Sequence, residues 1–190
     1  IIEKNAKTLG IDCFRGSSDD VLDRYYHCAK KFQINTVVRI TSDCPLIDPQ
    51  IVDDVIRKYQ HEDYDYVTNT LNRSYPIGTD VEIFSFEILE KTWQKAILPS
   101  EREHVTLFIK NKKSDFKLGD LKNSKNLSNL RWTLDREDDL NLIRKIVSKV
   151  NKNPILMSDI LNLFSIEPEL IKINEHIPQN EGMLKSLKKD

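Results

Sequence analysis

The first 70 residues alternate between short apolar runs and segments with helical periodicity. Strands are predicted at 11–15, 36–41 and 64–68, because each is a short, largely apolar or β-branched run bounded by polar residues. Apolar side chains within 21–32 and within 51–59 recur every three or four residues, as on one face of a helix. The resulting order, β-α-β-α-β, predicts an α/β fold with a mostly parallel, right-handed sheet covered by helices.

The second part of the chain departs from this alternation. Residues 80–84 alternate acidic and apolar side chains, as expected of a half-buried strand, and strands are also predicted at 116–121 and 130–134. Asp48 is the predicted cap of the helix at 51–59, and further helices are predicted at 1–9, after the capping residues Ser85, Ser100 and Asp135, and around 158–163 and 168–173.

Composition excludes several classes of protein. The chain of 190 residues is 39% hydrophobic and 31% charged, which suits either one globular domain of ordinary size or one large domain with an appendage. The net charge of −1 gives no reason to expect a nucleic-acid groove. We see no signal peptide and no apolar run near the roughly 20 residues of a membrane span. The three cysteines lack CxxC spacing, which favours a reducing, cytoplasmic location.

The beginning of the chain is unusual. It starts Ile-Ile-Glu-Lys, without a methionine, in what has the pattern of a helix already under way. None of the five glycines belongs to a phosphate-binding loop of the GxGxxG or GxxxxGK type. We therefore expect that the sequence is truncated at its N-terminus.

Two acids lie in the same local sequence pattern. Asp43 and Asp135 each follow an apolar predicted strand and precede a predicted helix. Ligands of open α/β sheets bind beyond the carboxyl ends of strands, so two carboxylates on one edge could hold Mg²⁺ and bridge it to phosphates. The alternatives are a helix N-cap for Asp135 and a turn acid before Pro45 for Asp43.

The segment 100–104 carries several ionisable residues at one predicted helix start. Arg102 could bind a carboxylate or phosphate, with His104 as a hydrogen-bonding partner. The alternative is a capped and solvated helix end, which such a Ser-Glu-Arg-Glu pattern also favours.

Two further groups of polar residues each allow a functional and a structural interpretation. Asp80 and Glu82 share one strand face and could line a polar pocket with Tyr75, or form the wet face of an edge strand. Arg15 and Arg24 flank a predicted helix start, where an anion such as a nucleotide could bind, although surface arginines are common.

Several segments taken together resemble one known family. These segments lie in order along the chain at 14–25, 39–49, 75–82, 99–106, 130–135 (with Trp-Thr-Leu-Asp at its end) and near 180–182. Through them the chain is similar, over nearly its whole length, to the spore coat polysaccharide biosynthesis protein F family, within the cytidylyltransferases that make CMP-activated acidic sugars.

The resemblance implies a Rossmann-like, three-layer nucleotide-diphospho-sugar transferase fold. It implies a domain at 1–150, with an excursion at 70–120 for sugar binding and homodimer contact, and a helical extension at 151–190. The implied reaction joins CTP and an acidic sugar of the 2-keto-3-deoxy type, with Mg²⁺ as cofactor, in surface polysaccharide biosynthesis in the cytoplasm.

The resemblance also implies roles for individual residues. Asp43 and Asp135 match the family's metal-binding, catalytic acids. Residues at the expected nucleotide site are Gly16, Ser17 and Arg24, and those at the expected sugar site are Tyr75, Asp80, Glu82, Glu101, Arg102 and His104.

One departure from the family bears on activity. Members open with a first strand and a small-residue loop bearing Arg that cradles the triphosphate, and this sequence lacks both. We expect that the 190 residues alone do not catalyse the reaction. Two alternatives remain open: a non-catalytic binding or oligomerisation module of the same fold, or a glycosyltransferase that uses a nucleotide-sugar donor.

Overall fold

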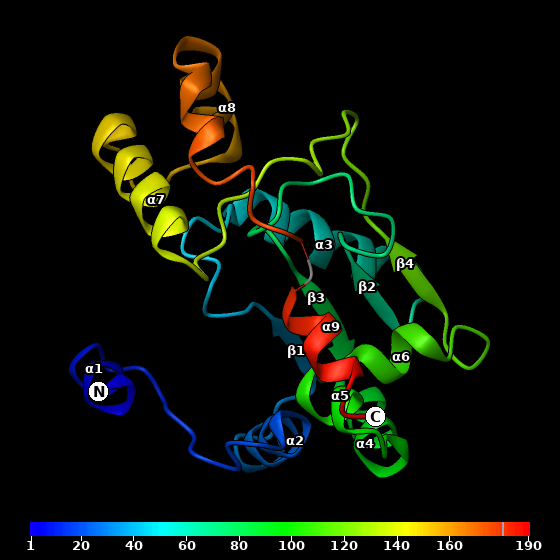
Figure 1. Cartoon of the computed structure of the whole chain (residues 1–190). Coiled ribbons are helices and arrows are strands. Elements are labelled where there is room, and N and C mark those ends of the chain that lie inside the picture. The colour runs from blue at the N-terminus through cyan, green and yellow to red at the C-terminus, as the bar shows by residue number, and fades with distance from the viewer. Residues whose placement is uncertain (180) are drawn as a thin grey trace. The chain divides into compact units, whose positions relative to one another are not determined.

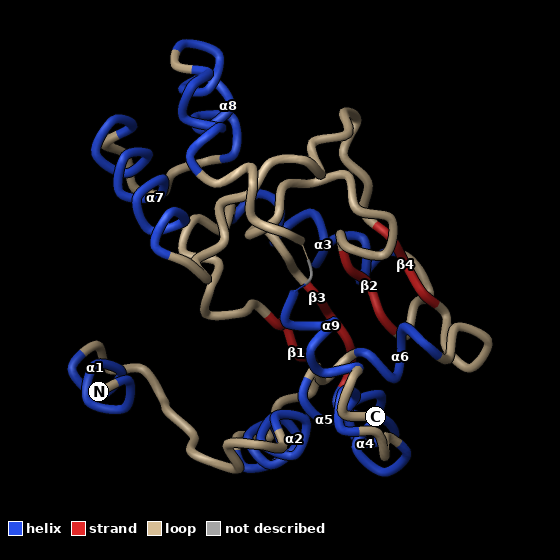
Figure 2. The backbone as a smooth tube through the Cα atoms, in the orientation of Figure 1, coloured by secondary structure: helices blue, strands red, loops and turns tan. Residues whose placement is uncertain are grey.

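A mixed, open sheet lies at the centre of the fold in the computed structural model, which describes residues 1–179 and 181–190 (Figure 1). Within those residues the sheet has the order β1-β3-β2-β4. β2 runs parallel to β4 and antiparallel to β3, and Figure 2 shows these three strands side by side. The strands are β1 (Thr36–Arg39), β2 (Tyr66–Thr68), β3 (Glu82–Ser85) and β4 (Leu118–Asp120).

Helices begin where the sequence supplies caps. The Asp48 side chain accepts a hydrogen bond from the Gln50 N–H, and the Ser85 hydroxyl accepts one from the Ile88 N–H, so both predicted N-caps are confirmed. The helices are α1 (Ile2–Thr8), α2 (Val21–Lys31), α3 (Pro49–His61), α4 (Phe86–Lys95), α5 (Pro99–Glu103), α6 (Leu107–Asn111), α7 (Glu137–Val150), α8 (Met157–Ile166), the 3₁₀ helix η1 (Pro168–Ile173) and α9 (Glu181–Leu187).

The contacts divide the chain into two compact units. Unit 1 holds residues 1–37, 85–112 and the described C-terminal residues, whereas unit 2 holds 38–84 and 113–179. The predicted functional division into 1–150 and 151–190 stays a prediction. None of the described helices is long and apolar enough to span a membrane.

Unit 1 has an aromatic centre between α2 and α4. The buried Tyr26 ring stacks on Trp93, with 4.1 Å between the ring centroids, and on Phe86 at 5.7 Å. The Trp93 indole N–H donates to the Asp23 carboxylate at 2.9 Å, so the polar end of the indole is also satisfied. These contacts fix the face of α2 on α4.

Unit 2 contains two hydrophobic clusters. One places Ile51 and Val55 of α3 against Val67 and Ile83 of the sheet. The other joins α7, α8 and η1 around the fully buried Trp132, and α7 and α8 lie side by side in Figure 1. Trp132 therefore packs against α7, α8 and η1.

Two predicted strands are wrong. Residues 11–15 are mostly exposed and pair with no strand among the described residues. Residues 130–134 make one parallel bridge, between Arg131 and Ile77, and no ladder. Gly78, which follows Ile77, has a φ of +100°, a value that does not continue a strand. A Cβ at this position would lie 2.6 Å from the Thr133 nitrogen, so only glycine allows the two segments to come this close.

Candidate functional site

The loops that carry Asp43 and Asp135 meet through main-chain atoms of unit 2. The Asp43 carbonyl accepts hydrogen bonds from the Leu134 N–H at 2.8 Å and from the Thr133 hydroxyl at 3.0 Å. Asp135 follows Leu134 directly, so the structure brings the two acids together in the same region. Asp43 is half-buried and the Asp135 side chain is 51% exposed.

The two carboxylates suit Mg²⁺ in donor type. The Asp135 Oδ2 accepts a hydrogen bond from the Arg131 guanidinium at 2.7 Å, while the Cys44 thiol lies 3.7 Å from the Asp43 Oδ1. Among the described residues no cluster of three or more Asp, Glu, His or Cys could hold a metal. One or two carboxylates with water and substrate phosphates are nevertheless a common Mg²⁺ site, so the residues present fit that ion.

A buried acid, Asp139, organises the loop before α7. Its carboxylate accepts from the Arg131 Nε and Nη2, both at 2.9 Å, and from the Asn174 amide at 2.8 Å. It also accepts from the N–H groups of Asp135 and Arg136, at 3.0 Å each. Burial acts to raise the pKa of Asp139, but the hydrogen bonds from Arg131, Asn174 and the Asp135 main chain outweigh it and lower that pKa.

This network corrects one sequence-based expectation. Asp135 does not cap α7, because Arg136 occupies the N-cap position and Asp139 accepts the free N–H groups instead. Asp139 was missed by the sequence analysis. The available signal was its place in the first turn of α7, where an acid can fold back on preceding N–H groups.

Asp80 lies close to the Asp43 loop. Its two carboxylate oxygens accept a bidentate pair of hydrogen bonds from Arg73, each at 2.6 Å. Burial raises the pKa of the Cys44 thiol to about 11, and the negative charges of Asp43 and Asp80 act in the same direction. Cys44 therefore lies within electrostatic reach of both acids, and the structure places one expected sugar-side residue beside the expected metal site.

The state of Cys44 gives a testable expectation. At pH 8 a thiol with a pKa of about 11 is ionised in only about one molecule in a thousand, and Cys44 is also buried. In the native protein, iodoacetamide should label Cys44 at least about 100-fold more slowly than the exposed Cys13. Peptide mass spectrometry over a time course measures both rates, and denaturant serves as the control that makes them similar. Equal rates in the native state would contradict the described burial.

Glu82 and Tyr75 lie inside unit 2. The Glu82 carboxylate is 3% exposed, accepts a hydrogen bond from the Tyr66 hydroxyl and forms an ion pair with Arg39. Tyr75 is 6% exposed and packs in the α3 cluster, where burial raises the pKa of its hydroxyl. Both side chains are thus buried, whereas Asp135 is exposed, and their sugar-binding role stays a prediction.

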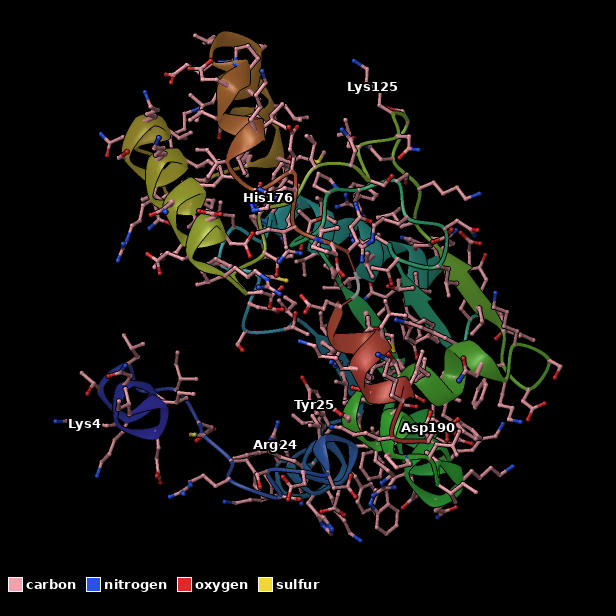
Figure 3. All side chains as sticks on the ribbon, viewed as in Figure 1. Lys4, Arg24, Tyr25, Lys125, His176 and Asp190 are labelled. Carbon is pink, nitrogen blue, oxygen red and sulfur yellow. The ribbon has the colours of Figure 1, made fainter. Side chains whose placement is uncertain are left out.

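The expected nucleotide residues surround the start of α2 in unit 1. The Ser17 hydroxyl accepts from the Asp20 N–H at 3.0 Å, and Arg24 donates to the Ser17 carbonyl at 2.9 Å. A Cβ on Gly16 would lie 3.1 Å from the Arg24 side chain, so this turn is tight. Asp20 is the N-cap of α2, and Arg24 with Tyr25 projects from that helix in Figure 3.

Arg102 connects α5 to the same turn. Its Nε and Nη2 donate to the Asp20 Oδ2 at 2.9 and 2.6 Å, and its Nη1 donates to the Trp93 carbonyl at 2.8 Å. Glu101 is buried, and His104 is half-buried one turn away. The structure thus brings the expected nucleotide segment and the 100–104 segment together within unit 1.

The C-terminal residues engage α5. The carboxylate of Asp190, which Figure 3 labels, accepts hydrogen bonds from the Ser100 N–H at 2.9 Å and from the Ser100 hydroxyl at 2.6 Å. Ser100 therefore does not open α5 as its own cap, as the sequence suggested, because Leu98 occupies the N-cap position.

Unit 2 combines strands of an open α/β sheet with two acids that converge at the loop after β1, which is where enzymes of this architecture bind phosphorylated ligands. These features are those of an α/β enzyme that binds a phosphorylated ligand. Residues 2–164 match the family described as Cytidylyltransferase, and the chain belongs to that family. It is therefore a nucleotidyltransferase, and the fold and family expected from the sequence are confirmed.

Individual relatives agree with this assignment. An uncharacterized protein of Methanocaldococcus jannaschii is 30% identical over 90% of this chain and 70% of its own length. The spore coat polysaccharide biosynthesis protein SpsF of Bacillus subtilis is 27% identical over 89% of this chain and 71% of its own. The solved structure of a cytidylyltransferase from Leptospira borgpetersenii has a TM-score of 0.86 and 31% identity, covering 90% of this chain and 72% of that one.

Proposed function

We propose that this protein transfers CMP from CTP to an acidic sugar of the 2-keto-3-deoxy type, in the biosynthesis of a surface polysaccharide. A sugar hydroxyl would attack the α-phosphorus of CTP, the bond from that phosphorus to the bridging oxygen would break, and pyrophosphate would leave. The proposal is supported by membership of the cytidylyltransferase family and by the name of the Bacillus subtilis relative.

The observation that carries the proposal is the hydrogen bonding of Thr133 and Leu134 to the Asp43 carbonyl. It holds Asp43 and Asp135 in one region, where both could bind a single Mg²⁺. A bound Mg²⁺ supplies charge neutralisation for the triphosphate. The protein's own part is to present the two carboxylates on loops whose main chains are fixed to each other.

The remaining roles belong to the proposal as well. We assign Gly16, Ser17 and Arg24 to the nucleotide, because they surround a helix start, where N–H groups favour anions. Asp80 is assigned to the sugar, since it lies near Asp43. The other sugar-side assignments (Tyr75, Glu82, Glu101, Arg102, His104) and the homodimer are supported chiefly by the resemblance, and the cytoplasmic location by the resemblance together with the cysteine pattern.

The test is pyrophosphate release from CTP with Mg²⁺, catalysed by the product of the complete open reading frame, over a panel of 2-keto-3-deoxy acids and counterparts that lack the carboxylate charge. An acidic sugar should give a kcat/KM about 10- to 100-fold above its neutral counterpart, the amount that one charge-assisted hydrogen bond contributes. UTP and ATP serve as nucleotide controls. Equal turnover of neutral and acidic sugars would contradict the acidic-sugar assignment, and release of free CMP or UDP from a nucleotide sugar without pyrophosphate would indicate a glycosyltransferase.

A further inference from the structure

The buried carboxylate of Asp139 lies between the positive charge of Arg131 and the main chain of Asp135. Asp139 has no exposed side-chain surface, and Arg131 is 8% exposed at its side chain. The Arg131 Nη2 reaches both acids, at 2.9 Å from the Asp139 Oδ2 and 2.7 Å from the Asp135 Oδ2. The Arg131 guanidinium is thus shared by the buried Asp139 and by Asp135 at the proposed metal site.

Arg131 makes more hydrogen bonds with Asp139 than with Asp135. Asp139 accepts two hydrogen bonds from it in a fork, which is the strong geometry for a guanidinium and a carboxylate. Asp135 receives one hydrogen bond from Arg131 and is half-exposed. The charge of Arg131 is therefore balanced chiefly by Asp139, which leaves the Asp135 carboxylate able to bind a cation from solution.

We propose that Asp139 is a positioning residue that keeps Asp135 available to a divalent cation, by neutralising Arg131 and by holding the Asp135 N–H. The inference rests on the proposed function, because it assumes that Asp135 binds the ion. Without the Asp139 charge, Arg131 would be balanced by Asp135 alone, and cation binding would have to break that ion pair. The other charged pair near this helix start, His176 with Asp138, is exposed and does not face Arg131 in any described contact.

Asp139→Asn tests the proposal, since it removes the charge and keeps the size of the side chain. Mn²⁺ is the probe, and its binding is followed by the loss of the electron paramagnetic resonance signal of the free ion. We expect the Kd for Mn²⁺ to rise about tenfold or more, in the range found when partners of metal ligands are replaced. The Mg²⁺ concentration for half-maximal turnover should rise by a similar factor, with kcat at saturating Mg²⁺ within about threefold of wild type.

Asn174→Ala is the matched control. It removes a different hydrogen bond to the Asp139 carboxylate, together with one to the Arg131 carbonyl, and keeps the Arg131 fork and the Asp135 contact. This variant should lose thermal stability and keep the wild-type Kd for Mn²⁺. A purely structural role for Asp139 would give both variants the same result, namely lower stability with unchanged Mn²⁺ binding, and that result would overturn the proposal.

A second variant keeps the test decisive where Asp139→Asn does not fold. The double variant Arg131→Met with Asp139→Asn removes both buried charges and leaves neither unpaired. Its Kd for Mn²⁺ should lie within about threefold of wild type, because no arginine then competes for Asp135. A double variant that binds Mn²⁺ tenfold more weakly than wild type overturns the proposal. Asp43→Ala separates this proposal from the proposed function. Unchanged Mn²⁺ binding by Asp43→Ala would mean that the assigned metal site is wrong, and the proposed function would then fail together with the role of Asp139.

Discussion

Replacement of Asp43 by alanine is expected to lower the rate of CTP-dependent pyrophosphate release by about 100- to 1000-fold. The variant removes one of two carboxylates assigned to Mg²⁺, and a bound metal contributes several kcal/mol of charge stabilisation to phosphoryl transfer. The fold should survive, because the contacts from Thr133 and Leu134 go to the Asp43 carbonyl and not to its side chain. Steady-state kinetics over a range of Mg²⁺ concentrations, together with circular dichroism, measure both effects.

Asp138→Ala provides the control for this experiment. Asp138 is an acid of the same α7 start, and its half-exposed side chain pairs with His176. Exposed pairs of this kind contribute little, so rate and stability should both stay close to wild type. Wild-type turnover by Asp43→Ala would remove Asp43 from the proposed metal site.

Gly78→Ala is expected to lower the free energy of unfolding by about 3–5 kcal/mol. Gly78 has a φ of +100°, which costs energy for any residue with a side chain. A Cβ there would also lie 2.6 Å from the Thr133 nitrogen and 2.7 Å from the Trp132 carbonyl carbon, which are main-chain atoms that cannot rotate away. Urea denaturation followed by circular dichroism gives the change, and cytidylyl transfer should fall with it because the displaced segment leads to Asp135.

Gly182→Ala is the matched glycine substitution. Gly182 lies in α9, and no atom lies within 4 Å of the position of its Cβ. Alanine is the better helix former, so this variant should be unchanged or more stable by up to about 1 kcal/mol. Equal urea midpoints for Gly78→Ala and wild type would refute the close packing of the turn on 132–133.

Local signals in the sequence were enough to place several elements. Asp48 followed by Pro49 marks the start of α3, and Ser85 marks the start of α4, because each supplies an acceptor for the first free N–H groups. The β-branched run that begins at Thr36 predicted β1, although the ladder ends at Arg39, before the polar loop. Such features depend on neighbours within a few residues and can be predicted from sequence.

Long-range pairing could not be predicted in the same way. β3 lies between β1 and β2 and runs antiparallel to β2, a choice of partners that its alternating sequence does not specify. Leu130 and Trp132 are apolar and buried in the cluster with α7 and α8, and burial alone does not imply a ladder. The prediction of residues 130–134 as a strand failed for that reason.

The same limit applies to the site. The general rule for strand ends placed Asp43 and Asp135 in one region, and the main-chain contacts of Leu134 agree with it. The side-chain partners were not foreseeable, because Arg131, Asp139 and Asn174 are brought together by the packing of η1 on α7. Their roles depend on tertiary contacts that spacing along the chain does not encode.

The attachment of Thr133 and Leu134 to one carbonyl has a consequence for protein engineering. The two segments are joined at the Asp43 carbonyl by the Leu134 N–H and the Thr133 hydroxyl, so neither acidic side chain takes part in the junction and both can be exchanged without removing it. Imidazole or thiolate groups in place of these carboxylates would favour zinc or other softer metals. This junction is therefore a starting template for a designed metal centre.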